Sequence, residues 1–233
     1  MASKSSSKGS REPGTLAKTY LFLYNFLQVI GWSYLLLLLI KHYTSPKKES
    51  LWETVKLTVI IFQNAAVLEI LHAAFRLVSS NVIITTFQVF SRVMVVCGVL
   101  LATPTGAASP GLGLALLAWS VTEIIRYMFY ALNIVGFVPY LLVWLRYTTF
   151  IALYPIGVTG ELLCLYAAQS YVAANQMWSV GMPNFLNFTF SYHYFMLIIM
   201  GLYVPLFPQM YLHMFAQRRK VLGGDGASSK KKQ

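Results

Sequence analysis

Charged side chains are scarce in this chain. Only 11% of its 233 residues are Asp, Glu, Lys or Arg, whereas 57% are apolar or aromatic. Ordinary soluble domains carry about 25% charged residues, and a soluble domain of this size could not bury so much apolar surface. The shortage of charge therefore excludes a water-soluble globular protein and predicts an integral membrane protein.

Cysteine is equally sparse. The two cysteines, Cys97 and Cys164, lie inside apolar runs and have no C-x-x-C spacing, so the sequence indicates neither a disulfide framework nor a metal site. We interpret both as buried membrane cysteines. No G-x-G-x-x-G motif follows a predicted strand, so a Rossmann-type nicotinamide reductase is not indicated. We expect a protein without a metal ion or redox cofactor.

Long apolar runs, by contrast, are abundant. A helix needs about 20 apolar residues to cross the hydrocarbon core of a bilayer. The sequence contains six such segments, at 20–40, 54–78, 82–102, 112–131, 140–168 and 185–206. The fifth contains Pro155, which removes a backbone donor, so we expect either one kinked helix or two shorter ones. The predicted fold is an all-α bundle of six transmembrane helices.

Basic residues collect at the two ends of the chain and account for most of the net charge of +11. Basic flanks mark the cytosolic side of a membrane protein, and their place beside apolar runs argues against a nucleic-acid partner. We predict a disordered basic cytosolic tail over 1–19, a six-span membrane domain over 20–206 and a second basic, disordered cytosolic tail over 207–233. The lysines of the 41–53 loop, on the opposite side, are a mild contradiction.

The chain ends in Lys230, Lys231 and Lys232 before a final Gln. This ending resembles a di-lysine retrieval signal of the endoplasmic reticulum. Attraction of a basic tail to anionic lipid is an equally good interpretation.

Acidic residues inside the predicted spans are few: Glu69, Glu123 and Glu161. A charge at mid-helix costs about 2.5 to 3.5 kcal/mol in insertion experiments, so such groups normally face the bundle interior and find partners. Glu69 shares a helix face with His72 and Arg76, and Glu123 stands three residues before Arg126. A structural polar network that holds the helices together is as good an explanation as a functional one.

Arg76, Arg126 and Arg146 fall towards the same, cytosolic ends of the second, fourth and fifth spans. Guanidinium groups that converge at one end of a bundle suit phosphate binding, because each presents a planar fork of donors. With Glu123 beside Arg126, these are the candidate substrate-binding residues. For any single arginine, extension to the lipid head groups is the simpler alternative.

The fifth span also holds Tyr154 and Glu161, which are seven residues apart. On a continuous helix they share a face, about 10 Å apart along the axis. A carboxylate and a phenol in an apolar site suit general acid–base chemistry. Spacing alone also allows a purely structural pair.

Around these two residues the sequence resembles a known family. Residues 145–161, Leu-Arg-Tyr-Thr-Thr-Phe-Ile-Ala-Leu-Tyr-Pro-Ile-Gly-Val-Thr-Gly-Glu, resemble the signature of the 3-hydroxyacyl-CoA dehydratases of very-long-chain fatty-acid elongation. Other blocks look like the same family, in a form closest to its plant members: 68–72, 119–127, 182–184 and 187–188. The resemblance covers roughly residues 20 to 220.

The resemblance implies an enzyme of the endoplasmic reticulum membrane that converts a long-chain or very-long-chain (3R)-3-hydroxyacyl-CoA to the trans-2-enoyl-CoA. Tyr154 and Glu161 match the family's catalytic positions, and Glu161 is our preferred base. The implied partners are the acyl-CoA substrate, membrane lipid, and the condensing enzyme and reductases of elongation. The CoA phosphates are expected near the arginines named above.

The family was first named for a resemblance to protein tyrosine phosphatases, whose chemistry needs a His-Cys-x5-Arg loop. The corresponding stretch here is 72–79, with Ala73 at the nucleophile position and Ser79 at the arginine position. Cysteine-based phosphatase chemistry is therefore excluded.

Two other functions are compatible with the sequence. A non-catalytic scaffold for elongation enzymes or signalling partners would share the fold, although retention of Tyr154 and Glu161 argues against it. A small transporter would use the buried charges as a solute path, but the sequence shows no internal repeat. The four histidines are scattered, unlike the clustered histidines of desaturases and condensing enzymes.

Overall fold

The computed structural model describes residues 14–45, 49–78, 80–185 and 187–223. In these residues the regular elements are helices, together with one isolated antiparallel bridge between Val180 and Phe190. In chain order they are α1 (Thr15–Thr44), α2 (Leu51–Ala65), α3 (Val67–Ala74), α4 (Val82–Val93), the π-helix η1 (Met94–Leu100), α5 (Pro104–Ala107), α6 (Gly111–Val135), α7 (Tyr140–Arg146), α8 (Phe150–Asn175) and α9 (Tyr192–Leu222). The predicted all-α class is confirmed.

Six helical segments in the described residues are long and apolar enough to cross a membrane. They are α1, α2 with α3, α4 with η1, α6, α8 and α9. The predicted number of spans is therefore confirmed, and the chain is a multi-pass membrane protein.

The fifth and sixth predicted segments differ most from the helices of the structure. The segment 140–168 is two helices, and the break lies between Arg146 and Phe150 rather than at Pro155. The last span begins at Tyr192, not at 185, and continues as helix to Leu222. The expected disorder over 207–233 is thus wrong for 207–222, because the apolar face of α9 continues past the predicted end. Residues 224–233, which include the three lysines, lie outside the described residues, as do residues 1–13.

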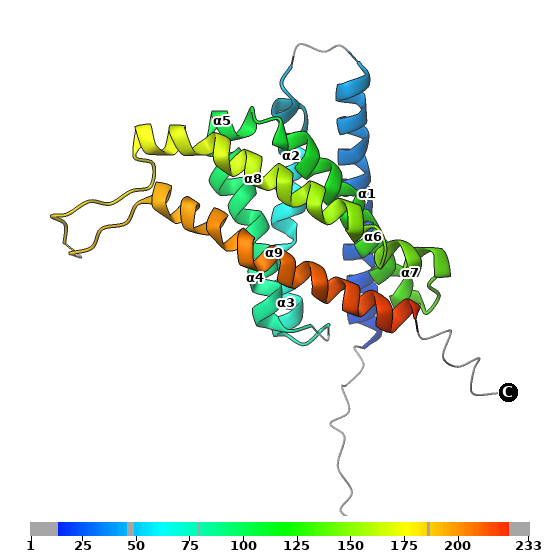
Figure 1. Cartoon of the computed structure of the whole chain (residues 1–233). Helices are drawn as coiled ribbons and strands as arrows, with labels where there is room; N and C mark the ends of the chain where they lie inside the picture. The colour runs from blue at the N-terminus through cyan, green and yellow to red at the C-terminus, as the bar shows by residue number, and fades with distance from the viewer. Residues whose placement is uncertain (1–13, 46–48, 79, 186, 224–233) are drawn as a thin grey trace, which may run out of the picture.

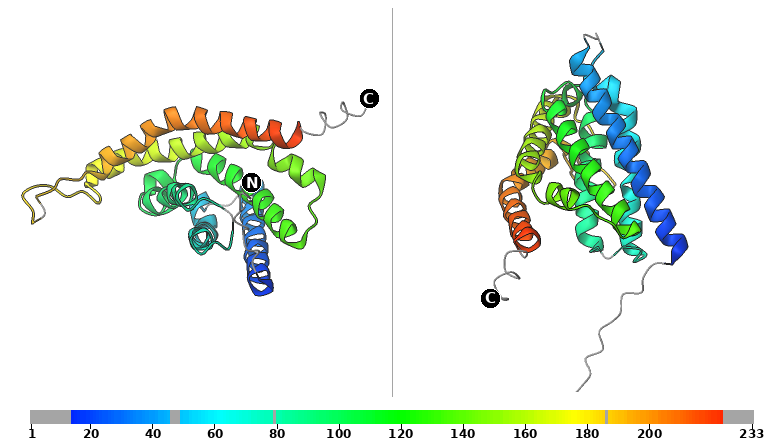
Figure 2. Two further views of the ribbon diagram at one scale, coloured as in Figure 1. Left: turned by 90° about the horizontal axis from the view of Figure 1, so that it is seen from below. Right: turned by 90° about the vertical axis from the view of Figure 1, so that its right-hand side faces the viewer.

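The helices form a bundle and, on one side of it, a layer made of α8 and α9 (Figures 1 and 2). α1 packs along α6, and α6 packs along α8. Figure 1 shows α8 and α9 side by side, crossing α1 at a steep angle, and Figure 2 (left) shows them as a layer on one side of the bundle. α9 is the least buried of the six spans. The loop between α8 and α9 extends away from the bundle (Figure 1).

Close contact between α6 and α8 depends on two glycines. A Cβ atom on Gly160 would lie 2.4 Å from the backbone nitrogen of Ala115 and 2.7 Å from the carbonyl oxygen of Gly111. A Cβ on Gly111 would lie 2.5 Å from the carbonyl oxygen of Gly160. Small residues let membrane helices approach closely and gain van der Waals contact. This contact places Glu161, the residue after Gly160, against α6.

Candidate active site

Glu161 lies where α6, α8 and α9 meet. Its Oε1 accepts a hydrogen bond of 2.7 Å from the indole nitrogen of Trp119 on α6. Its Oε2 accepts one of 2.6 Å from the hydroxyl group of Tyr203 on α9. Both carboxylate oxygens thus have a neutral donor, and no ion pair to Glu161 occurs among the described residues. The side chain is half-buried and faces the interior of the α6–α8–α9 layer.

Tyr154 lies two turns before Glu161 on the same helix and also faces α9. Its ring stacks on Phe207, with centroids 5.1 Å apart and planes 5° from parallel, and on Tyr211 at 6.0 Å. No hydrogen bond to its hydroxyl group is made within the described residues, and Glu161 is near enough for its charge to act on the phenol. The two predicted catalytic residues therefore share one helix face without being bonded to each other.

One face of α9 provides the contacts of Tyr154 and the Tyr203 hydrogen bond to Glu161. Tyr203, Phe207 and Tyr211 recur at every fourth position and so lie on one side of the helix. Tyr211 also donates a hydrogen bond of 2.9 Å to the carbonyl oxygen of Ile151. In a regular helix that oxygen would accept from residue 155, but Pro155 has no N–H. The Tyr211 hydroxyl group therefore satisfies the acceptor that the proline leaves free.

The other two acidic residues of the spans belong to a buried ion-pair cluster. Arg126 donates two hydrogen bonds to Glu69, of 3.0 and 2.9 Å, and a third, of 2.7 Å, to Glu123. Tyr127 also donates to Glu69. Glu123 is fully buried, and its second oxygen pairs with Arg92 of α4. Two arginines and two glutamates thus neutralise one another across three spans, as the structural interpretation of these residues expects.

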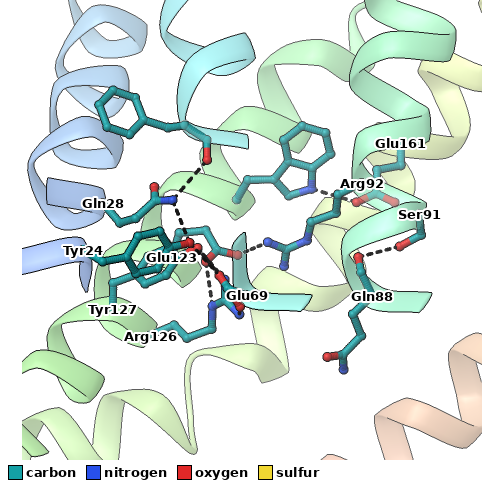
Figure 3. Close-up of polar contacts among 12 residues, drawn as sticks. Tyr24, Gln28, Glu69, Gln88, Ser91, Arg92, Glu123, Arg126, Tyr127 and Glu161 are labelled. Carbon is teal, nitrogen blue, oxygen red and sulfur yellow. Dashed lines mark hydrogen bonds and ion pairs between the residues drawn. The ribbon is translucent and has the colours of Figure 1, made fainter. Parts of the chain in front are cut away.

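Arg92 connects this cluster with the carboxylate on α8. Figure 3 shows its guanidinium group between Glu123 and Glu161, and it is near enough to Glu161 for the two charges to attract. Arg92 therefore joins the ion-pair cluster to the Tyr154–Glu161 face by electrostatics.

Two of the predicted phosphate-binding arginines line one cavity, which has a volume of about 200 Å³. The Arg126 side chain lines this cavity and is at the same time paired with the carboxylates of Glu69 and Glu123. Arg146, at the end of α7, lies over the rings of Phe129 and Tyr130, and its Nη1 has no hydrogen-bond partner within the described residues. Arg76 is exposed in the turn after α3 and is not part of the lining. The structure thus brings Arg126 and Arg146 together and leaves Arg76 apart.

Two residues of the site, Trp119 and Tyr203, were not predicted from the sequence. Trp119 lies in one of the family-like blocks, but nothing local relates it to Glu161. Tyr203 belongs to a series of aromatic residues at 203, 207, 211 and 215, and this repeat every four residues marks one face of a helix. That spacing was the available indication that α9 presents an aromatic surface to another helix.

Comparison with known proteins shows the family to which this chain belongs. The family described as "Protein tyrosine phosphatase-like protein, PTPLA" matches residues 63–224. The mouse (Mus musculus) protein named very-long-chain (3R)-3-hydroxyacyl-CoA dehydratase 2 is 44% identical over 90% of this chain and 83% of its own length. The Caenorhabditis elegans protein named very-long-chain (3R)-3-hydroxyacyl-CoA dehydratase hpo-8 is 46% identical over 93% of this chain and 99% of its own.

The Arabidopsis thaliana protein named very-long-chain (3R)-3-hydroxyacyl-CoA dehydratase PASTICCINO 2 is 37% identical over 88% of this chain and 93% of its own. It has the lowest identity of the three, so a special likeness to plant members is not seen among them. No solved structure matches the chain. On the matched residues and these identities, the chain belongs to the PTPLA family, which the sequence resemblance identified as that of the very-long-chain (3R)-3-hydroxyacyl-CoA dehydratases.

Proposed function

We propose that this protein dehydrates a long-chain or very-long-chain (3R)-3-hydroxyacyl-CoA to the trans-2-enoyl-CoA, the third step of fatty-acid elongation. In the proposed reaction Glu161 removes a proton from C2, and the electrons of that bond form the C2–C3 double bond. The C3–oxygen bond breaks, and the hydroxyl group leaves as water with a proton from Tyr154. Transfer of a proton from Glu161 to Tyr154 restores both groups.

The observation that carries this proposal is the setting of Glu161. Its carboxylate lies in an apolar helix layer, accepts hydrogen bonds from two neutral donors, and shares a helix face with Tyr154. Glu69 and Glu123, by contrast, are directly paired with arginine. A carboxylate bound to a guanidinium group is a poor proton acceptor because protonation would break the ion pair. Glu161 is therefore the acidic residue of the spans best suited to act as a base.

The cavity beside Arg146 is the proposed site of the CoA phosphates. It lies at the start of α8, next to Phe150, and so one turn from Tyr154. A volume of about 200 Å³ is small beside ligand pockets of about 300 to 1,000 Å³, so we assign it to a phosphate group and not to the whole coenzyme. Arg146 would supply the contact, while Arg126 and Glu123 hold the cavity wall in place. The acyl chain would occupy an apolar channel among the spans, beside Tyr154.

We place the protein in the endoplasmic reticulum membrane with both termini in the cytosol. The excess of basic residues at both ends supports this orientation. An acyl-CoA made in the cytosol would then meet Arg146 at the cytosolic end of the bundle. The proposed partners are the condensing enzyme and the reductases of elongation, which produce the substrate and consume the product, and membrane lipid around the spans.

The direct test is conversion of a (3R)-3-hydroxyacyl-CoA series of increasing chain length by the purified protein, followed by chromatography of the enoyl-CoA product. General acid–base groups contribute about 10²- to 10⁴-fold each, so Tyr154→Phe and Glu161→Gln should each lower turnover by that factor. Neither change alters the side-chain volume appreciably, so both variants should remain folded.

Two exposed residues provide matched controls. Tyr194→Phe and Glu53→Gln make the same chemical changes on α9 and α2, and both should leave turnover unchanged. Near-normal turnover in both Tyr154→Phe and Glu161→Gln would refute the site. Absence of product from folded wild-type protein would refute the enzymatic proposal and favour a non-catalytic scaffold.

A further inference from the structure

The hydroxyl group of Tyr203 has a single use in the structure. Tyr203 lies on the inward face of α9, partly buried against the core. Its O–H group donates to Glu161 Oε2, which is the one hydrogen bond that this group makes among the described residues. A hydroxyl group in an apolar layer costs free energy unless it is bonded, and the next residue on the same face is Phe207, which has none. Packing of α9 on α8 thus accounts for the ring but not for the hydroxyl group.

Trp119 presents its indole nitrogen to the same carboxylate from the opposite helix. The side chain is 3% exposed, so its N–H needs a buried acceptor, and Glu161 Oε1 supplies it at 2.7 Å. Each donor binds a different oxygen of the carboxylate. Two bonds to two oxygens fix both the position of the carboxyl group and the rotation of its plane.

We propose that Tyr203 and Trp119 are positioning residues, which hold the Glu161 carboxylate in the orientation needed to take the C2 proton. This inference rests on the proposed dehydratase function and extends it to two residues on the neighbouring helices. Neither residue needs to contact the substrate. A displacement of about 1 Å at a catalytic group can cost about 10²-fold in rate, so freeing one oxygen should be costly even when the carboxylate itself remains.

The experiment compares Tyr203→Phe and Trp119→Phe with wild-type protein and Tyr194→Phe. Each test variant removes one donor and keeps an aromatic ring in place. We expect kcat to fall by about 10- to 100-fold in each, with KM within roughly twofold of wild type, because an interaction that acts only on the chemical step changes kcat and not substrate binding. Tyr194→Phe, whose tyrosine is 67% exposed on the same helix, should keep both constants.

Rates are referred to the amount of folded, monodisperse protein, so that loss of structure does not count as loss of catalysis. A wild-type kcat in Tyr203→Phe overturns the inference for Tyr203, and a wild-type kcat in Trp119→Phe overturns it for Trp119. A rise in KM with unchanged kcat would also overturn it, since that result means substrate contact. None of these outcomes affects the dehydratase proposal, which fails only if folded wild-type protein forms no enoyl-CoA product.

Discussion

At the scale of single residues, the acidic side chains in the spans have two different surroundings. Glu69 and Glu123 are bound by arginine and belong to a cluster whose charges cancel. Glu161 is bound by a tyrosine and a tryptophan, which stabilise it without neutralising its charge. The first setting suits a permanent structural role, and the second suits a group that gains and loses a proton.

The ion-pair cluster gives a prediction about stability. Arg126→Met would leave Glu69 and Glu123 without the guanidinium group that they share. Removing one partner of a buried ion pair typically costs about 3 to 5 kcal/mol, so the thermal unfolding midpoint in detergent should fall clearly. Lys56→Met, which breaks the exposed pair with Glu53, should cost about 0 to 1 kcal/mol. Equal midpoints for the two variants would mean that Arg126 is not structural and would favour the phosphate-binding interpretation.

At the scale of helices, the position of the site depends on how closely α6 approaches α8. The backbone of α8 at Gly160 lies against the backbone of α6 at Gly111 and Ala115. This contact sets the distance between Trp119, one turn after Ala115 on α6, and Glu161, the residue after Gly160 on α8. The tyrosines of α9 hold the other side of α8, at Ile151 and at Glu161. The site is therefore held in place by the contacts of α8 with two neighbouring helices.

Gly160→Ala tests this arrangement. The new methyl group would meet backbone atoms at 2.4 to 2.7 Å, so the helices have to separate. Inserting a methyl group into a packed contact costs about 1 to 3 kcal/mol, and the Trp119–Glu161 bond should lengthen, so both the unfolding midpoint and turnover should fall.

Gly201→Ala is the matched control, because nothing lies within 4 Å of the Cβ position at Gly201 on α9. It should be neutral or slightly stabilising, since alanine favours a helix over glycine by about 1 kcal/mol. If Gly160→Ala behaved like Gly201→Ala, the close approach of α6 and α8 would not matter for the site.

At the scale of the whole molecule, six spans require both ends of the chain to lie on one side of the membrane. The first described turn of α1, the short helix α7 and the last turn of α9 all lie towards the lower part of Figure 1. The loop between α8 and α9 leaves the bundle from the far end of those two helices (Figure 1). Arg146, which is the last residue of α7 and lines the cavity, therefore lies towards the same end of the bundle as the start of α1 and the end of α9.

Epitope tags in sealed microsomes test this topology. Tags at both termini should be removed by protease without detergent, whereas a tag inserted in the loop 176–191 should resist until detergent is added. Protection of either terminal tag would imply an odd number of crossings or the reverse orientation. That result would also remove the Arg146 cavity from the cytosolic side.

The sequence by itself determined the class of protein and the number of spans. Hydropathy is a local property, and a run of about 20 apolar residues is enough to cross a bilayer. The family-like motif also predicted Tyr154 and Glu161 as the catalytic residues, because both lie within one short stretch of chain. Helix ends were less predictable: α9 runs to Leu222, since its contacts with α8 continue beyond the most apolar residues.

Only the tertiary structure decided which groups surround Tyr154 and Glu161, the proposed catalytic pair. Trp119 and Tyr203 are each 42 residues from Glu161 in sequence, on different helices, and no local pattern relates them to it. The hydrogen bond from Arg126 to Glu69 likewise joins residues that are 57 positions apart in sequence. Because of this bond, Arg126, a candidate phosphate-binding residue, is part of the ion-pair cluster. A hydrogen bond needs its partners within about 3 Å, and helix packing, not sequence spacing, brings them there.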